Sequence, residues 1–520
     1  MNRLINIPCL AIIVIALIFC GCKKQLETAP RQSVNDQTAL TSKENIDASI
    51  TGIYARLKNA RQYGRDMITH PEALADNGFA TNKSGRLLGE SANNFPTQTA
   101  NQFTTTIWSN SYAAINQINL TLEAIPNLNL PTITQVDRNR WNGQLYFLRG
   151  LYYFDLVRVY AYIPGAVVAS QDKGGVILST KGISNFQDAL NFQPARAPID
   201  SVYIQIVNDL TNANSLLLST ASVNTANKIA AQALLAKVNL YRKNYSEAKR
   251  WADSCITLAS SKLTNTGNYI NNWRAATNSE TMFQVAFLAA SENIGVNESL
   301  QTSFTTLVTP GITTQTGGFG DLVPTLTLLT DLGITLVGGN TSTSNFAVNA
   351  SIASRSSDIR NLLFEVGTTG RGNSKVECTK FIGKSGAINL DNVPVIRIAE
   401  VYLVRAEALG TPGSPVYNAV TALADLKTIK SSRYVGYVGS AIETADNALT
   451  GAGLLDEIIR QRRIELAFEG NRFFDLKRLG RDLVKSPHYN TVAFTDVRIL
   501  PLLPQADLDI NPNLKQNAGY

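Results

Sequence analysis

The stretch Leu454–Gly480, LLDEIIRQRRIELAFEGNRFFDLKRLG, holds charged and aromatic residues more densely than any other part of the chain. Its apolar residues recur at helical spacing and share one face: Leu455, Ile458, Ile459 and Leu466. Gly470 offers a left-handed stop to this helix, and Asn471 is in position to cap a second, shorter helix. The stretch therefore predicts two helices joined by a tight turn.

Acidic and basic residues of this stretch lie three positions apart, so that they meet on a helix surface. The pairs are Glu457 and Arg460, Arg462 and Glu465, Glu469 and Arg472, and Asp475 and Arg478. One interpretation makes Glu465 and Glu469 a general acid/base pair. The other makes them partners of the arginines in a partly buried ionic network. We favour the network, because every acid has a base within reach and a catalytic pair would need relief from those bases.

A short apolar run follows a positive charge at the N-terminus. Arg3 supplies the charge, and Leu10–Phe19 is too short to cross a bilayer as a stable anchor. The run ends in Phe-Cys-Gly-Cys, which is similar to a bacterial lipobox with Gly21 before the acceptor thiol of Cys22. We therefore expect residues 1–21 to be a lipoprotein signal peptide and Cys22 to be lipidated. Plain secretion with cleavage nearby is the alternative.

Composition argues against several classes of protein. The chain has 520 residues, 44% hydrophobic and 17% charged, which suits an extensive globular core. Its formal net charge of +7 is scattered, without the clustered bases of a nucleic-acid-binding surface. His70 and His488 are the only histidines of the sequence, so we expect no His-based triad or zinc site. We also expect no cofactor and no catalytic residue. Cys255 and Cys378 are open to one disulfide, but two buried thiols are favoured because Cys255 lies in a helical apolar pattern.

Helical periodicity recurs along most of the chain. Helices are predicted at 42–57, 107–125, 141–160, 203–218, 227–243, 245–258, 395–409 and 414–430. The segments 227–258 and 395–430 read as tetratricopeptide-like helix pairs, in which small alanines allow close approach. The sequence thus predicts a mainly α fold, an α/α superhelix of such pairs, with long irregular insertions that contain a few short β-strands.

Two polar regions interrupt this pattern. Residues 64–106 show no sustained periodicity, and residues 259–394 are rich in Thr, Ser, Gly and Asn, with an exposed loop expected at 311–320. Short β-like runs lie in the second region, at 281–287 and 380–382. Long irregular segments inside a compact protein often carry function.

Several stretches together resemble one family. The 454–480 motif, the run QLYFLRGLYYFDLVRVYAYIP, the helix at 395–409 and the proline-punctuated tail ending QNAGY are similar, in order, to signatures of the SusD/RagB family. Members are outer-membrane nutrient-binding lipoproteins. The resemblance implies an N-terminal region, 22–260, with helical repeats, and a C-terminal region, 261–520, with the ligand-face insertion and the final repeats.

The resemblance also implies partners and a location. These are an oligosaccharide ligand, a lipid anchor in the cell outer membrane with the protein facing outward, and a SusC-like TonB-dependent transporter, without catalysis. Some members of the family bind peptides, so the ligand class stays open. A secreted glycoside hydrolase would need two carboxylates about 5 to 9.5 Å apart in a cleft, and no pair stands out from structural partners. A scaffold that uses its repeats for protein contacts is the third alternative.

Candidate ligand residues lie in the two irregular regions, because sugars need flat apolar surfaces flanked by carboxylates and amides. The segment LADNGF supplies Asp76, Asn77 and Phe79, a neighbourhood that contributes to the ligand face in the family that this chain resembles. The second region offers Phe304, and Phe319 in GGFGD. Asp-Asn-Gly is also an ordinary turn signal, and a loop phenylalanine often packs inward.

Overall fold

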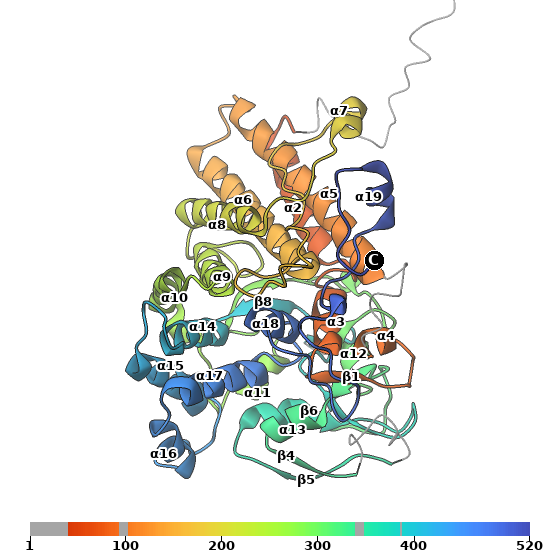
Figure 1. The fold of residues 1–520 in the computed structure, drawn as a ribbon, viewed down its shortest axis with the longest axis vertical. Helices are drawn as coiled ribbons and strands as arrows, with labels where there is room; N and C mark the ends of the chain where they lie inside the picture. Colours follow the sequence, from red (N-terminus) through yellow and green to blue (C-terminus); the bar gives the residue numbers. More distant parts are fainter. Residues whose placement is uncertain (1–39, 93–101, 339–347, 385–386) are drawn as a thin grey trace, which may run out of the picture.

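The computed structural model describes residues 40–92, 102–338, 348–384 and 387–520. In this part of the chain, helices stack along one side, and short two-stranded sheets and loops lie along the other (Figure 1). The predicted mainly α fold with a few short strands is confirmed.

The first part of the stack contains four helices that precede the predicted repeats. They are α2 (Lys43–Leu57), α5 (Gln102–Ala124), α6 (Gln135–Tyr160) and α8 (Ile199–Leu216). Ser42 caps α2 as predicted, since its side chain accepts the backbone N–H of Asn45. The aromatic run on α6 is core, because its aromatic rings are almost entirely buried, among them Trp141, Phe147, Tyr152, Tyr153, Phe154 and Tyr160.

The repeats continue the stack. They comprise α9 (Lys228–Tyr241), α10 (Tyr245–Ala259), α14 (Ile398–Gly410), α15 (Ala419–Ser431) and α17 (Gly451–Glu465). Each of these packs on its neighbour, and α10 packs on α14 although the larger insertion separates them in sequence (Figure 1). The small residues that were expected to allow close approach are fully buried: Ala233, Ala236, Ala248 and Ala252.

One helix prediction and one strand prediction are shifted along the chain. The predicted helix at 395–409 begins only at Ile398, because β8 (Val393–Arg397) pairs antiparallel with β2 (Thr281–Val285) instead. Both strands are buried almost throughout, so a strict alternation of apolar and polar residues does not mark them. The run predicted at 380–382 is not a strand, and the strand lies at β7 (Val376–Cys378).

The expectation of irregular structure from 64 to 106 is wrong for part of that range. It contains α3 (Asp66–Leu74), β1 (Gly78–Ala80) and α4 (Leu88–Ser91). All residues of α3 are buried, so the helix has no polar face and its sequence shows no amphipathic periodicity.

Shorter elements complete the described chain. The helices are α7 (Phe186–Asn191), α11 (Tyr269–Arg274), α12 (Leu300–Phe304), α13 (Leu326–Asp331), α16 (Ala441–Asn447), α18 (Arg472–Leu479) and α19 (Gln505–Ile510). The strands are β3 (Leu322–Pro324), β4 (Ile334–Val337), β5 (Ser351–Arg355) and β6 (Phe364–Val366), and the sheets pair β1 with β3, β2 with β8, β4 with β5 and β6 with β7.

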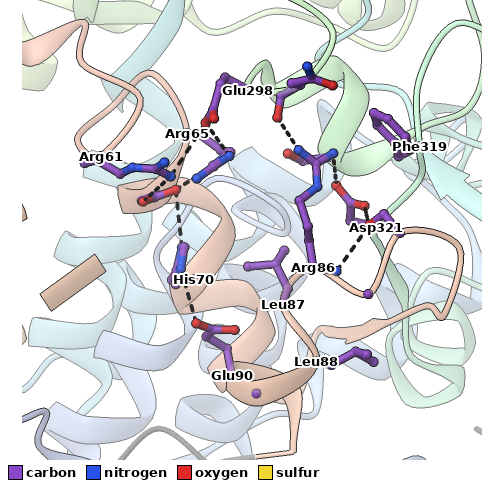
Figure 2. A pocket seen from close by; sticks show the side chains of 16 residues that line it. Arg61, Arg65, His70, Arg86, Leu87, Leu88, Glu90, Glu298, Phe319 and Asp321 are labelled. Carbon is purple, nitrogen blue, oxygen red and sulfur yellow. Dashed lines mark hydrogen bonds and ion pairs between the residues drawn. The ribbon is translucent and has the colours of Figure 1, made fainter. Parts of the chain in front are cut away.

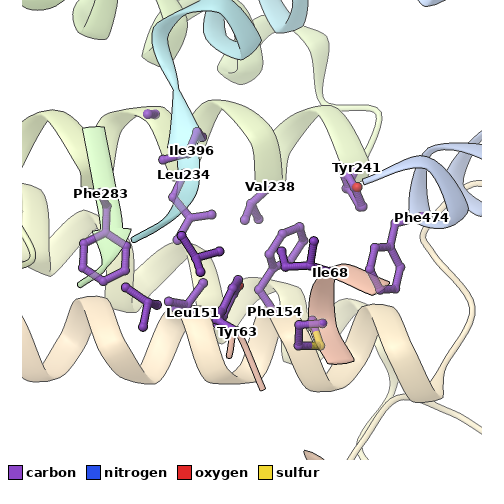
Figure 3. Packing of buried hydrophobic residues seen from close by; sticks show 14 of the residues in the cluster. Tyr63, Ile68, Leu151, Phe154, Leu234, Val238, Tyr241, Phe283, Ile396 and Phe474 are labelled. Carbon is purple, nitrogen blue, oxygen red and sulfur yellow. The ribbon is translucent and has the colours of Figure 1, made fainter. Parts of the chain in front are cut away.

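One apolar core links the stack to the other side of the molecule. Figure 3 shows Leu151 and Phe154 of α6 beneath Leu234 and Val238 of α9. Side chains from four other elements enter the same cluster: Ile68 of α3, Phe283 of β2, Ile396 of β8 and Phe474 of α18. Burial of each large apolar side chain contributes about 2 kcal/mol, so helices and irregular regions stabilise one another.

A buried ion-pair network lies where the 454–480 motif meets the insertion. Glu465, the last residue of α17, lies 3.0 Å from the nearest nitrogens of Arg397 and Arg433 and 3.3 Å from that of Arg360. Each of these side chains is at most 1% exposed. Burial raises the pKa of Glu465, but Arg433 and the other arginines outweigh it and hold that pKa well below its usual range. Glu465 is therefore ionised, and its role is structural.

Two further carboxylates share these arginines. Glu280 lies 2.7 Å from both Arg397 and Arg433, and Glu469 lies 2.8 Å from Arg397 and 2.6 Å from Lys380. The predicted ionic network is thus confirmed for Glu465 and Glu469, because each of them is paired with buried cations.

Only half of the predicted short-range pairs form. Glu457 and Arg460 pair, as do Asp475 and Arg478. In the other two pairs the arginines bind different acids: Arg462 binds Glu400 and Asp475, and Arg472 binds Asp76. Gly470 does adopt a left-handed conformation, but the Asn471 side chain makes no capping bond to α18 and accepts a hydrogen bond from Lys237 instead.

We expect Glu465→Gln to lower the free energy of unfolding by about 3 to 5 kcal/mol. The amide keeps the shape of the side chain but leaves three buried arginines short of one negative charge. Chemical denaturation monitored by circular dichroism measures the loss. Glu247→Gln is the matched control, because the Glu247–Arg250 pair on α10 is exposed and contributes about 1 kcal/mol or less. Equal stability of the two variants would contradict the structural role of Glu465.

Candidate ligand-binding site

A cavity of about 710 Å³ opens between two segments that are far apart in sequence. One wall comes from residues 61–90, and the other comes from residues 297–321 of the insertion (Figure 2). Figure 2 shows charged side chains from both walls turned toward one another across the opening.

Local structure explains how the walls meet. α3 carries Asp66 and His70, and the short helix α4 carries Glu90. β1 pairs antiparallel with β3. Beside this sheet, the backbone N–H of Thr81 donates a hydrogen bond to the carbonyl oxygen of Asp321. The sheet thereby fixes the insertion against the loop that precedes α4.

Ion pairs join the two walls at both ends of the cavity. At one end, the Arg65 guanidinium contacts Glu298 and lies 2.6 Å from Asp66, while Arg61 lies 3.4 Å from Asp66. At the other end, Arg86 Nη2 lies 2.7 Å from Asp321. The walls are therefore held by charge as well as by backbone pairing.

His70 lies on the cavity floor between two carboxylates. Its Nδ1 is 3.6 Å from Asp66, and its Nε2 is 3.4 Å from Glu90. Burial lowers the pKa of His70, but Asp66 and Glu90 outweigh it, so the pKa is raised above its ordinary value. The positive form of His70 is thus favoured beside the two acids.

Phe319 is the aromatic residue of the cavity, and it is half-buried. The guanidinium carbon of Arg86 is 4.7 Å from the centre of its ring, and that of Arg371 is 3.9 Å away. Cations at these distances are attracted to the face of an aromatic ring. Because two guanidinium groups lie over the ring, Phe319 is not an open platform for a sugar in this structure.

Two of the sequence-predicted site residues are held by the 454–480 motif. Asp76 accepts hydrogen bonds from Arg472 at 2.6 and 2.8 Å, and Asn77 accepts one from Arg463 at 2.9 Å. Burial raises the pKa of Asp76, but Arg472 outweighs it and the pKa falls to about 2. Both residues lie outside the cavity lining, and their role as ligand contacts stays a prediction.

Two predicted phenylalanines are also interior. Phe79 is 1% exposed and stacks on His488 with ring centres 3.9 Å apart. Phe304 is fully buried and packs edge-on against Phe468. Of the five predicted ligand residues, Phe319 alone lines the cavity.

Sequence reasoning missed the charged residues of the walls. Arg86 lies in a glycine-rich run, KSGRLLGE, and Asp321 follows Phe319 by two positions in GGFGD, so both stood beside recognisable loop signals. Their pairing across the cavity depends on the β1–β3 register, which no local pattern shows.

The structure tests the prediction for two of the cysteines and not the one for Cys22. Cys255 and Cys378 are buried and unpaired, and burial raises the pKa of each thiol to about 12. Two buried thiols are thus confirmed. Cys22 and the proposed signal peptide lie outside the described residues.

Comparison with known proteins decides the family. A sequence model described as "starch-binding associating with outer membrane" matches residues 24–240, and the SusD family model matches residues 352–520. The chain belongs to the SusD family.

Its relatives align with it from end to end. Two SusD-like proteins of Formosa agariphila are 26% and 24% identical to this SusD-family chain, over 98% and 100% of both chains. A SusD superfamily structure from Bacteroides thetaiotaomicron matches 92% of the chain and 100% of its own length, with 24% identity and a TM-score of 0.75. A structure named a laminarin-binding SusD-like protein matches 92% of the chain and all of its own length, with 21% identity and a TM-score of 0.65. At such identity the structures establish the fold alone.

Proposed function

We propose that this SusD-family protein binds an oligosaccharide in the cavity between residues 61–90 and 297–321, without catalysis, and delivers it to a SusC-like TonB-dependent transporter. The observation that carries the proposal is the cavity itself, whose walls alternate carboxylates and guanidinium groups. A sugar hydroxyl both donates and accepts hydrogen bonds, so such walls offer it partners of both kinds. The laminarin-binding neighbour with the same fold adds support by analogy.

The arrangement of charges favours binding over hydrolysis. A glycosidase needs one carboxylic acid to protonate the leaving oxygen and a second carboxylate opposite it. Here each cavity carboxylate has a cationic partner: Asp66 with Arg61 and Arg65, Glu298 with Arg65, Asp321 with Arg86, and Glu90 with His70. Paired carboxylates of this kind suit the fixed orientation of a bound ligand.

A lipid anchor at Cys22 is the second part of the proposal. The family model that matches the N-terminal region is described as associating with the outer membrane. Among the described helices, none has both the length and the apolar character that a membrane crossing requires. Metabolic labelling with a fatty-acid probe should mark the wild type and not Cys22→Ser, and equal labelling of both would contradict the anchor.

We expect calorimetric titration with a panel of glycans to find a ligand that is bound and not shortened. Phe319→Ala should weaken its binding about three- to tenfold, because the ring orients Arg86 and Arg371 at the cavity. Chromatography of the sugars after incubation tests for cleavage. Release of shortened products would overturn the non-enzymatic proposal.

Two further variants serve as controls for that titration. Phe186→Ala removes a ring that is 77% exposed on α7, beside a different groove, and should leave affinity and stability unchanged. Asp76→Asn removes the charge that Arg472 binds, so it should lower stability, and a loss of affinity in the folded variant would make Asp76 a ligand contact as the sequence predicts. Undiminished affinity of Phe319→Ala would place the ligand elsewhere.

A further inference from the structure

Arg371 lies beside the cavity, over the ring of Phe319, and its orientation is fixed. Its Nε donates to the carbonyl oxygen of Gly318 at 2.7 Å, and its guanidinium carbon is 3.9 Å from the ring centre. The residue is exposed, and within the described ranges its two Nη groups have no hydrogen-bond or ion-pair partner. A planar guanidinium held in this way can bind a carboxylate or a sulfate through parallel N–H···O bonds.

Charge is unbalanced at this end of the cavity. Arg86 pairs with Asp321, and the nearby Lys83 pairs with Glu377 at 3.2 Å, so each of these cations is already neutralised. Arg371 adds a positive charge that no described carboxylate pairs with. The opposite end is balanced by two arginines and two carboxylates, Arg61 and Arg65 against Asp66 and Glu298. A ligand that complements the whole site therefore carries negative charge near Phe319.

We propose that the oligosaccharide is acidic, and that Arg371 binds its carboxylate or sulfate group. This rests on the proposed glycan site and specifies the class of sugar. In this proposal Phe319 orients the guanidinium groups of Arg86 and Arg371, because both lie over its ring and leave no face open for stacking on a sugar. Arg371 then determines specificity, while the cavity walls bind hydroxyl groups that acidic and neutral sugars share.

The test is a calorimetric titration of the full chain with trigalacturonate, a sulfated galactan oligosaccharide, a neutral galactan of equal length and a glutamate-rich peptide. At least one acidic sugar should bind about tenfold more tightly than the neutral one, and added salt should reduce that difference. Arg371→Gln should weaken binding of the acidic sugar about tenfold and leave binding of the neutral sugar unchanged. Arg371→Lys should restore only part of the loss, because lysine keeps the charge but lacks the planar fork.

The control variant is Arg250→Gln, which removes an exposed arginine from α10 and should change nothing. Equal affinity for acidic and neutral sugars, or undiminished acidic binding by Arg371→Gln, would overturn the acidic class while leaving the cavity as a glycan site. Binding of the acidic peptide with no binding of any sugar would overturn both proposals.

Discussion

Glu465 forms ion pairs with three buried arginines from separate parts of the chain, and the position of the insertion depends on these ion pairs. Arg397 ends β8, Arg433 follows α15, and Arg360 lies in the insertion itself. Desolvation makes such a cluster a weak source of net stability, but removal of one partner is costly because the others stay buried. We infer that the network contributes specificity, because all these charges are paired in the arrangement that joins the insertion to the helical stack.

The same motif positions the wall of the cavity. After α17 the chain turns at Gly470, whose left-handed backbone passes so close to α3 that a Cβ would collide with the carbonyl oxygen of Met67. Glu72 of α3 accepts the backbone N–H groups of Gly470 and Asn471 at 2.9 and 3.2 Å. α3 is thus fixed to the turn, and α3 carries Asp66 to the cavity. The position of α3 therefore links the 454–480 motif to the geometry of the cavity.

Sequence alone could predict what depends on local periodicity. The amphipathic helices, the Ser42 cap and the turn at Gly470 follow from residue spacing and backbone preference, and the structure has all three. α3 was missed because a helix buried on every side has no periodicity to detect. Long-range partners were missed as well: Asp76 looked like part of a turn, yet it binds Arg472 nearly four hundred positions away. Phe319 was found because it lies in a glycine-rich loop, whereas its two arginines come from other segments.

The proposed ligand site lies between two walls that the buried network and the β1–β3 pairing hold together. The most direct test is a crystal structure of the protein with the oligosaccharide that titration identifies. We expect sugar density in the cavity, with hydroxyl groups within hydrogen-bonding distance of Arg86 or Asp321 and with the side chains of the 454–480 motif unmoved. Density in the separate apolar groove between α5, α7 and α19, with this cavity empty, would contradict it.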